Sequence, residues 1–526
     1  MLKQTTQTIK DAMKGISRYI TCKVIFDFTD VTILDDNKTL STSDNNSITD
    51  STQIINKNRD RAYKIATFEK DKFKLDGSYR IPSSNANDNG EQGWWSSFVC
   101  DSEGNFSAPP TIQIVFDNIH SIPALTITFD TLENEYATDF EVMVYDATDI
   151  LIENQHIQAN DKTQVLILGN FYQFKKIVLK INKWNKPYRF SKVTEIDFGV
   201  LKTYDDTQLI KASLIDEVNL LNETLPASEF SFTIDNSNNE FNLLNPDSAY
   251  KFLQERQQVT VYMGIEANGQ ISYYKIGTYY LTEWKTEQSS FTFTFVARSI
   301  IDTLLRYDYE SVMPRTTNLY NIAVEILNTA GITDYEIDTR LQQISTLGLM
   351  EKTNCRDALL MVLQAGRSYC YTDSNGKIHI VQDTTDLNNA VDSIELQNMY
   401  SEPEISLSKA IKRVKVSYFI DLETKTDVIV ENELIEKGEI YPLEGNTLIN
   451  TEEHAIDVAN WLMKWLKRRA VYSVNWRQNY LLDLLDVVTI ENRFNNKNAV
   501  IYKQELNYQG YLSGRTEARG DINVMA

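Results

Sequence analysis

Aromatic and aliphatic residues alternate with polar ones in LPASEFSFTIDNSNNEFNLLNPDSAYKFLQERQQVTVYMG at 225–264, and this pattern sets the fold class. Phe230, Phe232 and Ile234 fall on one side of an extended chain, because successive side chains of a strand point to opposite faces. The pattern resumes in KIGTYYLTEWKTEQSSFTFTFVARSIIDTLL at 275–305. Such runs predict half-buried antiparallel strands. We therefore expect a β domain around these two stretches.

Turn and cap residues indicate where elements of this β domain begin and end. Asn268 and Gly269 form the dipeptide that favours a two-residue hairpin, so two strands are predicted to meet there. A helix is predicted over SAYKFLQERQ at 248–257, where Pro246 and Asp247 provide a favourable start.

Evenly spaced strands also occur upstream, between residues 111 and 183. In FEVMVYD, for example, Phe140, Val142 and Val144 share one face. Several short strands at such spacing are typical of a β-sandwich or jelly roll. A polar stretch precedes them, so we expect an inserted sandwich over 86–190.

Helical patterns appear after residue 298. SIIDTLLRY at 299–307 and NLYNIAVEILNTAG at 318–331 are predicted helices. CRDALLMVLQAG is a third, with Asn354 as its cap and Gly366 as its stop. A long helix is expected at 451–469. Its predicted buried stripe consists of Ala455, Val458, Leu462 and Trp465.

The sequence thus predicts a mainly β, multidomain α+β protein. A length of 526 residues suits several domains rather than one core. Low glycine (19) beside abundant Tyr (28) and Phe (22) also favours sheets. The expected division is 1–85 (short helix and first strands), 86–190 (inserted sandwich), 191–300 (β), 301–390 (α+β) and 391–526 (β with the long helix).

Charge and cysteine content limit the function classes. A net charge of −21 argues against nucleic-acid binding, which needs a clustered basic face. The four cysteines have no CxxC spacing, so we expect small buried thiols and no metal site. The first 20 residues lack an apolar run long enough for a signal peptide or a membrane anchor. Synthesis and assembly are therefore expected in the cytoplasm.

Motifs of catalysis are missing from the sequence. It contains no GxSxG, no phosphate-binding loop, no GxGxxG and no HExxH. The four histidines are isolated along the chain, and carboxylate pairs such as Asp483 and Asp486 do not stand out in an acidic protein. We expect no catalytic residue, no cofactor and no enzymatic activity.

Three parts of the sequence resemble tail proteins of phages that infect low-GC Gram-positive bacteria. The first is KIATFEKDKFKLDGSYRIP at 64–82, which leads into GWW at 93–95. The second is the alternating region 225–305. The third joins NCRDALLMVLQAGRSYCYTDSNGKIHI at 354–380 to NTLINTEEHAIDVANWLMKWLKRR and RQNYLLDLLDVVTIENRF within 446–494. Their order is similar to that in tail hub, or tail-associated, proteins of phages and tail-like particles.

The resemblance implies a structural role at the tip or baseplate of a phage-type tail. Such hubs are trimers in which two tube-type, barrel-like β domains per chain make a pseudo-sixfold ring. Here those domains would be 20–85 with 190–300, and about 390–526. Implied partners are the distal tail and tail tube proteins, and further ones the tape-measure and receptor-binding proteins. The wider family often adds a C-terminal peptidoglycan hydrolase, which is not expected here because the chain stops at Ala526.

The predicted sandwich is similar to galactose-binding-like jelly rolls, so a cell-surface glycan is a further candidate partner. Aromatic platforms beside polar groups bind sugars. Trp94, Trp95, Trp184 and Tyr188 are the candidates, and packing where the insertion joins the rest is the other interpretation. Two functions stay open at this point: a trimeric hub located in the virion tail, and a carbohydrate-binding adsorption module that recognises the host. An enzyme acting on wall glycan is a more distant third.

Overall fold

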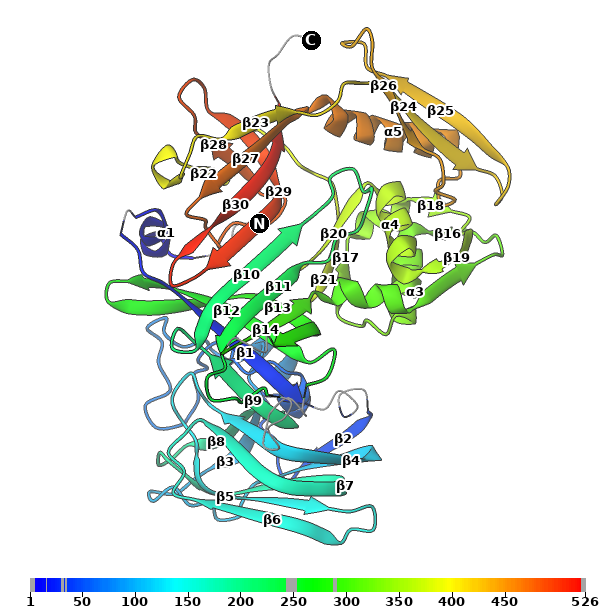
Figure 1. Cartoon of the computed structure of the whole chain (residues 1–526). Coiled ribbons are helices and arrows are strands. Elements are labelled where there is room, and N and C mark those ends of the chain that lie inside the picture. Colours follow the sequence, from blue (N-terminus) through cyan, green and yellow to red (C-terminus); the bar gives the residue numbers. More distant parts are fainter. Residues whose placement is uncertain are drawn as a thin grey trace. The chain divides into compact units, whose positions relative to one another are not determined.

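The computed structural model is mainly β. Strands account for 47% of the chain and helices for 15%, in several sheets (Figure 1), so the expected mainly β, multidomain fold class is confirmed. The structure describes residues 5–15, 17–29, 33, 36–242, 253–286 and 291–521.

The chain forms two compact units. The larger unit consists of Met1–Ile25, Thr203–Lys251 and Gln258–Ala526, and the inserted unit consists of Phe26–Lys202 with Phe252–Gln257. Each unit has a hydrophobic core of its own. Two strands, β1 (Ile20–Thr29) and β9 (Gly199–Tyr204), carry the chain across the boundary.

A seven-stranded sheet forms the inserted unit, in the order β3-β8-β4-β7-β5-β6 with β2 beside β4. Its strands are β2 (Lys38–Thr42), β3 (Trp94–Val99), β4 (Thr111–Phe129), β5 (Ala137–Tyr145), β6 (Leu151–Gln158), β7 (Gln164–Trp184) and β8 (Phe190–Asp197). The first half of β4 lies between β2 and β7, whereas its second half lies between β8 and β7. The two long strands therefore take part in both layers, and the sheet folds over one core as a sandwich does.

The core of the inserted unit follows the predicted alternation. Phe140, Val142 and Val144 of β5 are fully buried, while the residues between them are partly exposed. Edge-to-face aromatic pairs fill the centre, with the ring centroids of Phe129 and Phe140 5.5 Å apart. The strand assignment made from the sequence is confirmed here.

The inserted unit begins earlier than the sequence predicted. Ile54 is buried in its core, and β2 pairs with β4 from Lys38 opposite Phe116 to Thr42 opposite Ile112. Residues 26–85 thus belong to the sandwich and not to a tube-type domain of the larger unit. The sequence could not place this boundary, because the segment is polar and its partners lie far along the chain.

Ion pairs are buried inside the inserted unit. The Lys192 ammonium lies 2.9 Å from the Glu69 carboxylate and 2.8 Å from that of Glu135. The Lys72 ammonium lies 3.0 Å from Glu135. Burial alone would raise the pKa of Glu135, but the positive charges of Lys192 and Lys72 lower it to about 2. These charges can be buried because each carboxylate faces an ammonium group.

A long, mostly antiparallel sheet forms the larger unit, in the order β23-β27-β30-β29-β10-β11-β14-β13-β12, with β28 beside β29 and β22 beside β28. Its strands are β10 (Leu209–Glu217), β11 (Glu229–Asp235), β12 (Gln258–Ala267), β13 (Gln270–Thr286), β14 (Thr292–Arg298), β22 (Asp392–Ile394), β23 (Glu404–Leu407), β27 (Ala470–Trp476), β28 (Val487–Ile490), β29 (Lys497–Tyr508) and β30 (Leu512–Gly520). Phe230, Phe232 and Ile234 are buried as predicted. The hairpin between β12 and β13 turns at Asn268 and Gly269, whose φ angles of 53° and 76° suit a primed turn.

Helices of the larger unit largely match the sequence analysis. They are α1 (Gln7–Lys14), α3 (Leu319–Thr329), α4 (Cys355–Gly366) and α5 (Glu452–Lys467). The predicted stripe of α5, namely Ala455, Val458, Leu462 and Trp465, is buried in the core. The helix predicted at 299–307 is a 3-10 helix, Ile300–Arg306.

The ends of α4 show one success and one error. The Asn354 side chain accepts the N–H of Asp357 at 2.9 Å, so the predicted cap is confirmed. Gly366 was predicted to stop the helix but is its last helical residue. Arg367 takes the left-handed conformation instead, with φ 53°. The stop rule failed because it assigns that backbone conformation to glycine.

The remaining elements connect these parts. They are the strands β15 (Asp308–Ser311), β16 (Thr317–Asn318), β17 (Tyr335–Ile337), β18 (Ser345–Thr346), β19 (Met350–Asn354), β20 (Ser368–Thr372), β21 (Ile378–Gln382), β24 (Ile411–Phe419), β25 (Lys425–Glu431) and β26 (Glu439–Leu443), and the 3-10 helices Ser51–Ile55, Ala86–Asn89, Thr339–Gln343 and Leu396–Asn398. The helix predicted at 248–257 starts outside the described residues, and the described part, from 253, is not helical. Among the described helices, none has the length and apolarity needed to cross a bilayer.

We predict that the fragment 26–202 folds by itself and that the fragment 86–190 does not. The shorter fragment lacks β2 and most of β8, and Glu135 loses two of its buried counter-charges, Lys72 and Lys192, and keeps only those nearer the surface. Thermal melts followed by circular dichroism should show a cooperative transition for the long fragment alone. A cooperative melt of 86–190 would contradict this boundary.

Lys192→Met should lower the free energy of unfolding by about 3–5 kcal/mol, because Glu69 and Glu135 lose a buried counter-charge. The control is Lys183→Met at an exposed position of β7, expected to change stability by about 0.5 kcal/mol or less. Urea unfolding of the full chain measures both. Equal effects of the two substitutions would argue against a structural role of the buried pairs.

Candidate functional site

Strands far apart in the sequence meet at the centre of the larger unit's sheet. β10 pairs antiparallel with β29 through six residue pairs, from Ala212 opposite Tyr508 to Glu217 opposite Lys503. On its other side β10 pairs with β11, and β29 pairs with β30. The group β10–β14 and the group β27–β30 therefore form one continuous sheet.

One face of this joined sheet is polar. A row of side chains crosses five strands in register, and it consists of Arg298, Glu229, Ile215, Glu505 and Arg515. The Arg298 guanidinium lies 3.0 Å from the Glu229 carboxylate, and all five side chains are at least partly exposed. In the next row Ser213 donates to the Asn507 side chain at 2.8 Å across the β10–β29 pairing. The opposite face packs into the core, so the sheet has one hydrated face of mixed charge.

Four strands of the larger unit's sheet, β11, β12, β14 and β28, differ in their exposure. β11 and β14 each alternate between buried and partly exposed residues over most of their length. β12 is buried over 258–261, and both valines of β28, Val487 and Val488, are buried as well. The side chains of β11 and β14 are therefore more exposed to solvent on this face than those of β12 and β28.

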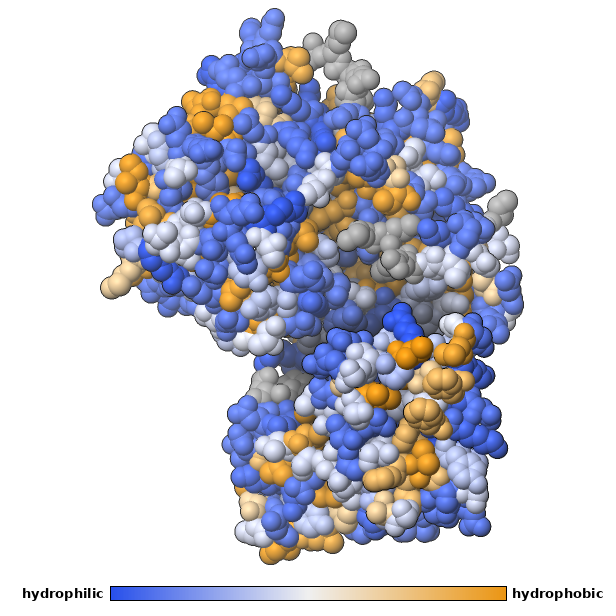
Figure 2. Space-filling model, turned by 180° about the vertical axis from the view of Figure 1, so that it is seen from behind, coloured by the Kyte–Doolittle hydropathy of each residue, from blue (hydrophilic) through white to orange (hydrophobic). Residues whose placement is uncertain are grey.

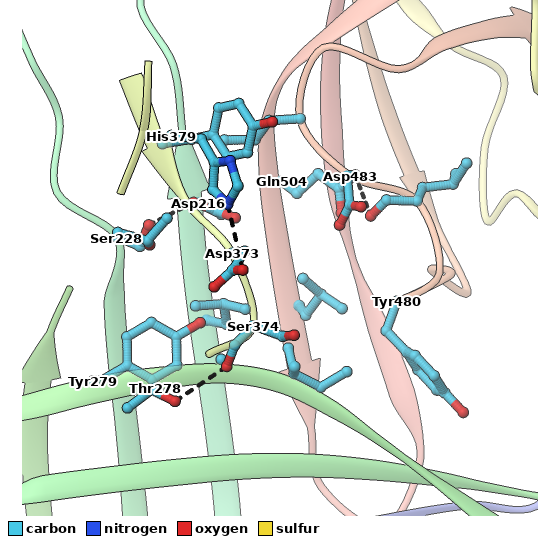
Figure 3. Close-up of a pocket in the computed structure, with 18 residues that line it drawn as sticks. Asp216, Ser228, Thr278, Tyr279, Asp373, Ser374, His379, Tyr480, Asp483 and Gln504 are labelled. Atoms are coloured by element: carbon cyan, nitrogen blue, oxygen red, sulfur yellow. Dashed lines mark hydrogen bonds and ion pairs between the residues drawn. The ribbon is translucent and has the colours of Figure 1, made fainter. Parts of the chain in front are cut away.

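A pocket of about 280 Å³ lies at a junction within the larger unit (Figure 3). Its walls come from β10, β13, the β20–β21 hairpin, the segment before β28, and β29. The turn at Gly376 (φ 88°) brings the hairpin tip against β13, where the Thr278 hydroxyl donates to the Ser374 carbonyl at 3.1 Å. The pocket is therefore the meeting point of three chain segments that are distant in sequence.

Serine, histidine and carboxylates line this pocket but form two separate pairs. The Ser228 hydroxyl donates to the Asp216 carboxylate at 2.6 Å. Nε2 of His379 lies 3.3 Å from the Asp373 carboxylate, and the imidazole ring stacks on Tyr371. Nucleophilic catalysis needs the serine hydroxyl to bond to the base. In the described part of the chain Ser228 instead bonds to a carboxylate, which holds the loop before β11 against β10.

Local packing also explains the other polar groups of the pocket. Asp373 accepts the N–H groups of Asn375 and Lys377, as a turn-closing aspartate does. Burial raises the pKa of Tyr371, and the carboxylates of Asp483 and Asp373 raise it further, so the phenol stays protonated at neutral pH. These groups stabilise the hairpin tip.

The two carboxylates named from the sequence, Asp483 and Asp486, lie in a turn. Asp486 is buried, and its carboxylate accepts the N–H of Asp483 at 2.9 Å. The pair closes the turn before β28 and is not a pair of facing acids. Among the described residues no group of three or more His, Cys, Asp or Glu is arranged to hold a metal ion. The four cysteines, Cys22, Cys100, Cys355 and Cys370, are buried free thiols, as expected.

Three of the four glycan candidates are buried. Trp94, Trp95 and Trp184 are all within 1% of full burial, so no sugar can stack on them in this structure. The Trp95 ring instead carries Arg61 on its face, 4.7 Å from the ring centroid. Tyr188 alone is exposed, at 44%. From the sequence these residues were candidates for a sugar platform or for packing where the insertion joins the rest, and the three tryptophans are packed within β3 and β7 of the inserted unit.

Comparison with known proteins gives structural likeness only. No protein family and no curated protein matches the chain. A tail protein of Neisseria meningitidis is 10% identical with a TM-score of 0.42, over 61% of this chain and 94% of that one. A prophage tail protein of Listeria monocytogenes is 10% identical with a TM-score of 0.37, over 62% and 92%. A type VI secretion component of E. coli, described as similar to T4 bacteriophage tail proteins, is 10% identical with a TM-score of 0.35, over 60% and 74%.

These likenesses concern the fold. The three similar structures are described as two tail proteins and one secretion-system component.

We predict that the protein does not release sugars or peptides from cell walls, because Ser228 and His379 bond to different carboxylates. Purified protein is incubated with walls, and reducing ends and turbidity are followed against a boiled control. Turnover above that control that is lost in Ser228→Ala would show that the pocket is catalytic after all.

Proposed function

We propose that this chain is a structural component of a phage-type tail, namely the central hub at the tail tip or baseplate. The observation that carries the proposal is the pairing of β10 with β29. It joins two strand groups of one chain into a single sheet, so one chain supplies two sheet segments side by side. Three such chains would supply six, which fits a ring that continues a sixfold tube.

The polar face of the joined sheet supports a role as the wall of a channel. It presents Arg, Glu, Ser and Asn side chains in register around Ile215, and its charges are of both signs. Such a face stays hydrated, because Ile215, the apolar member of the row described above, lies between Glu229 and Glu505. The opposite face, with Phe230 and Phe232, supplies the rigid core behind it.

Assembly accounts for the protein's function better than chemistry does. In this proposal the chain is made and assembled in the host cytoplasm and resides in the virion tail. A homotrimer contacts the tail tube and the distal tail protein. Like-charged copies repel one another at a net charge of −21, so the partners are needed to organise the ring.

Microscopy of purified tail particles should resolve three copies of this chain around the axis at the tip. The polar face of β10, β11, β14 and β29 should point into the channel. Copies confined to the periphery would instead favour an adsorption module, and six copies on the axis would indicate a different tail protein.

A further inference from the structure

A loop of the inserted unit exposes apolar side chains. Phe68 is 97% exposed and Phe73 57%, and their rings lie parallel with centroids 5.9 Å apart. Leu75 and Ile81 are 68% and 70% exposed. Large apolar residues gathered on a surface in this way mark contact sites. Figure 2 shows apolar side chains of this kind among hydrophilic ones on the surface it draws.

The same loop buries its charged residues. Glu69, next to Phe68, is 4% exposed, and its carboxylate accepts the N–H of Phe190 at 3.0 Å and the Lys192 ammonium at 2.9 Å. Lys72, next to Phe73, is 6% exposed and lies 2.6 Å from the Glu133 carboxylate. The usual arrangement, with charge outside and phenylalanine inside, is reversed.

This reversal fixes the loop. Both of its ends are tied by backbone hydrogen bonds, since Ala66 donates to the Arg80 carbonyl at 2.8 Å and Arg80 donates to the Lys64 carbonyl at 2.9 Å. Buried ion pairs at Glu69 and Lys72 hold the middle. The two phenylalanines are therefore presented in a set position before any partner binds, which reduces the entropy lost on binding.

Charged side chains of both signs border the apolar ones, since exposed Asp71 and Asp76 accompany exposed Lys70 and Lys74. Lys70 and Lys74 are exposed, and within the described residues neither forms an ion pair. The Lys74 ammonium lies 5.6 Å from the centroid of the Tyr79 ring. A complementary surface would have an apolar pocket for the phenyl rings, carboxylates opposite Lys70 and Lys74, and donor groups opposite Asp71 and Asp76.

We propose that this loop docks the inserted unit onto another protein subunit, into an apolar pocket bordered by charged side chains, with carboxylates opposite Lys70 and Lys74. Exposed Asp71 and Asp76 lie among the same residues and disfavour an anionic bilayer. The four apolar side chains offer on the order of 500 Å². That is less than the roughly 800 Å² per partner of a standard dimer interface, and it fits the central hot spot of a contact with a different subunit.

The inference rests on the proposed tail function, and the test uses assembled particles. Phe73 is replaced by photoreactive p-benzoylphenylalanine, and irradiated particles are searched for cross-linked peptides. The expected product joins position 73 to a subunit other than this chain, at a peptide that contains apolar residues and Asp or Glu. Phe68→Ser with Phe73→Ser should lower the content of that subunit at least tenfold, and Lys70→Glu with Lys74→Glu should do so as well.

Phe494→Ser, at a phenylalanine of the larger unit that is 94% exposed, is the matched control and should leave particle composition unchanged. Unchanged melting temperatures would show that the loop variants fold. Three results would each overturn the docking proposal alone. The first is cross-linking only to copies of this chain, and the second is no cross-link in particles that contain the chain. The third is binding of the purified protein to phosphatidylglycerol vesicles that is lost in the double serine variant. Particles without the chain would overturn the proposed function too.

Discussion

The antiparallel pairing of β10 with β29 is the interaction on which the larger unit depends. It brings together residues almost 300 positions apart, and chain closure over such a distance must be offset by burial behind the sheet. Without it, two long edges would expose unpaired N–H and C=O groups to other chains. With it, the sheet has a core side lined with aromatic rings and a hydrated side of mixed charge.

A second constraint governs the inserted unit, where Lys72 and Lys192 meet buried carboxylates. Such networks are weak sources of net stability but are sensitive to the loss of a partner, so they specify one arrangement of the segments that carry them. Here they hold the loop that exposes Phe68 and Phe73. The same ion pairs that close the sandwich thus define its outer surface, and this links the packing of the unit to what it can bind.

A pocket lies at the junction of β10, β13, the β20–β21 hairpin and β29. Its polar residues are of the types found in active sites but lack the serine–histidine hydrogen bond. Ser228 and His379 are both present, but each is bonded to a nearby carboxylate that fixes a turn or a strand end. A hydroxyl that donates to Asp216 is oriented away from the role of a nucleophile. In this pocket the two pairs therefore position chain segments.

The sequence by itself determined the local features: the strand alternation at Phe230 and Phe140, the Asn268-Gly269 hairpin, the Asn354 cap and the buried stripe of α5. Those depend on side-chain periodicity and on hydrogen bonds between near neighbours. Tertiary structure alone decided the β10–β29 pairing, the start of the inserted unit near residue 26, the burial of Trp94 and Trp95, and the reversed loop around Phe68. Each of these depends on partners far along the chain, and a charged residue such as Glu69 looks solvated in sequence until Lys192 is placed beside it.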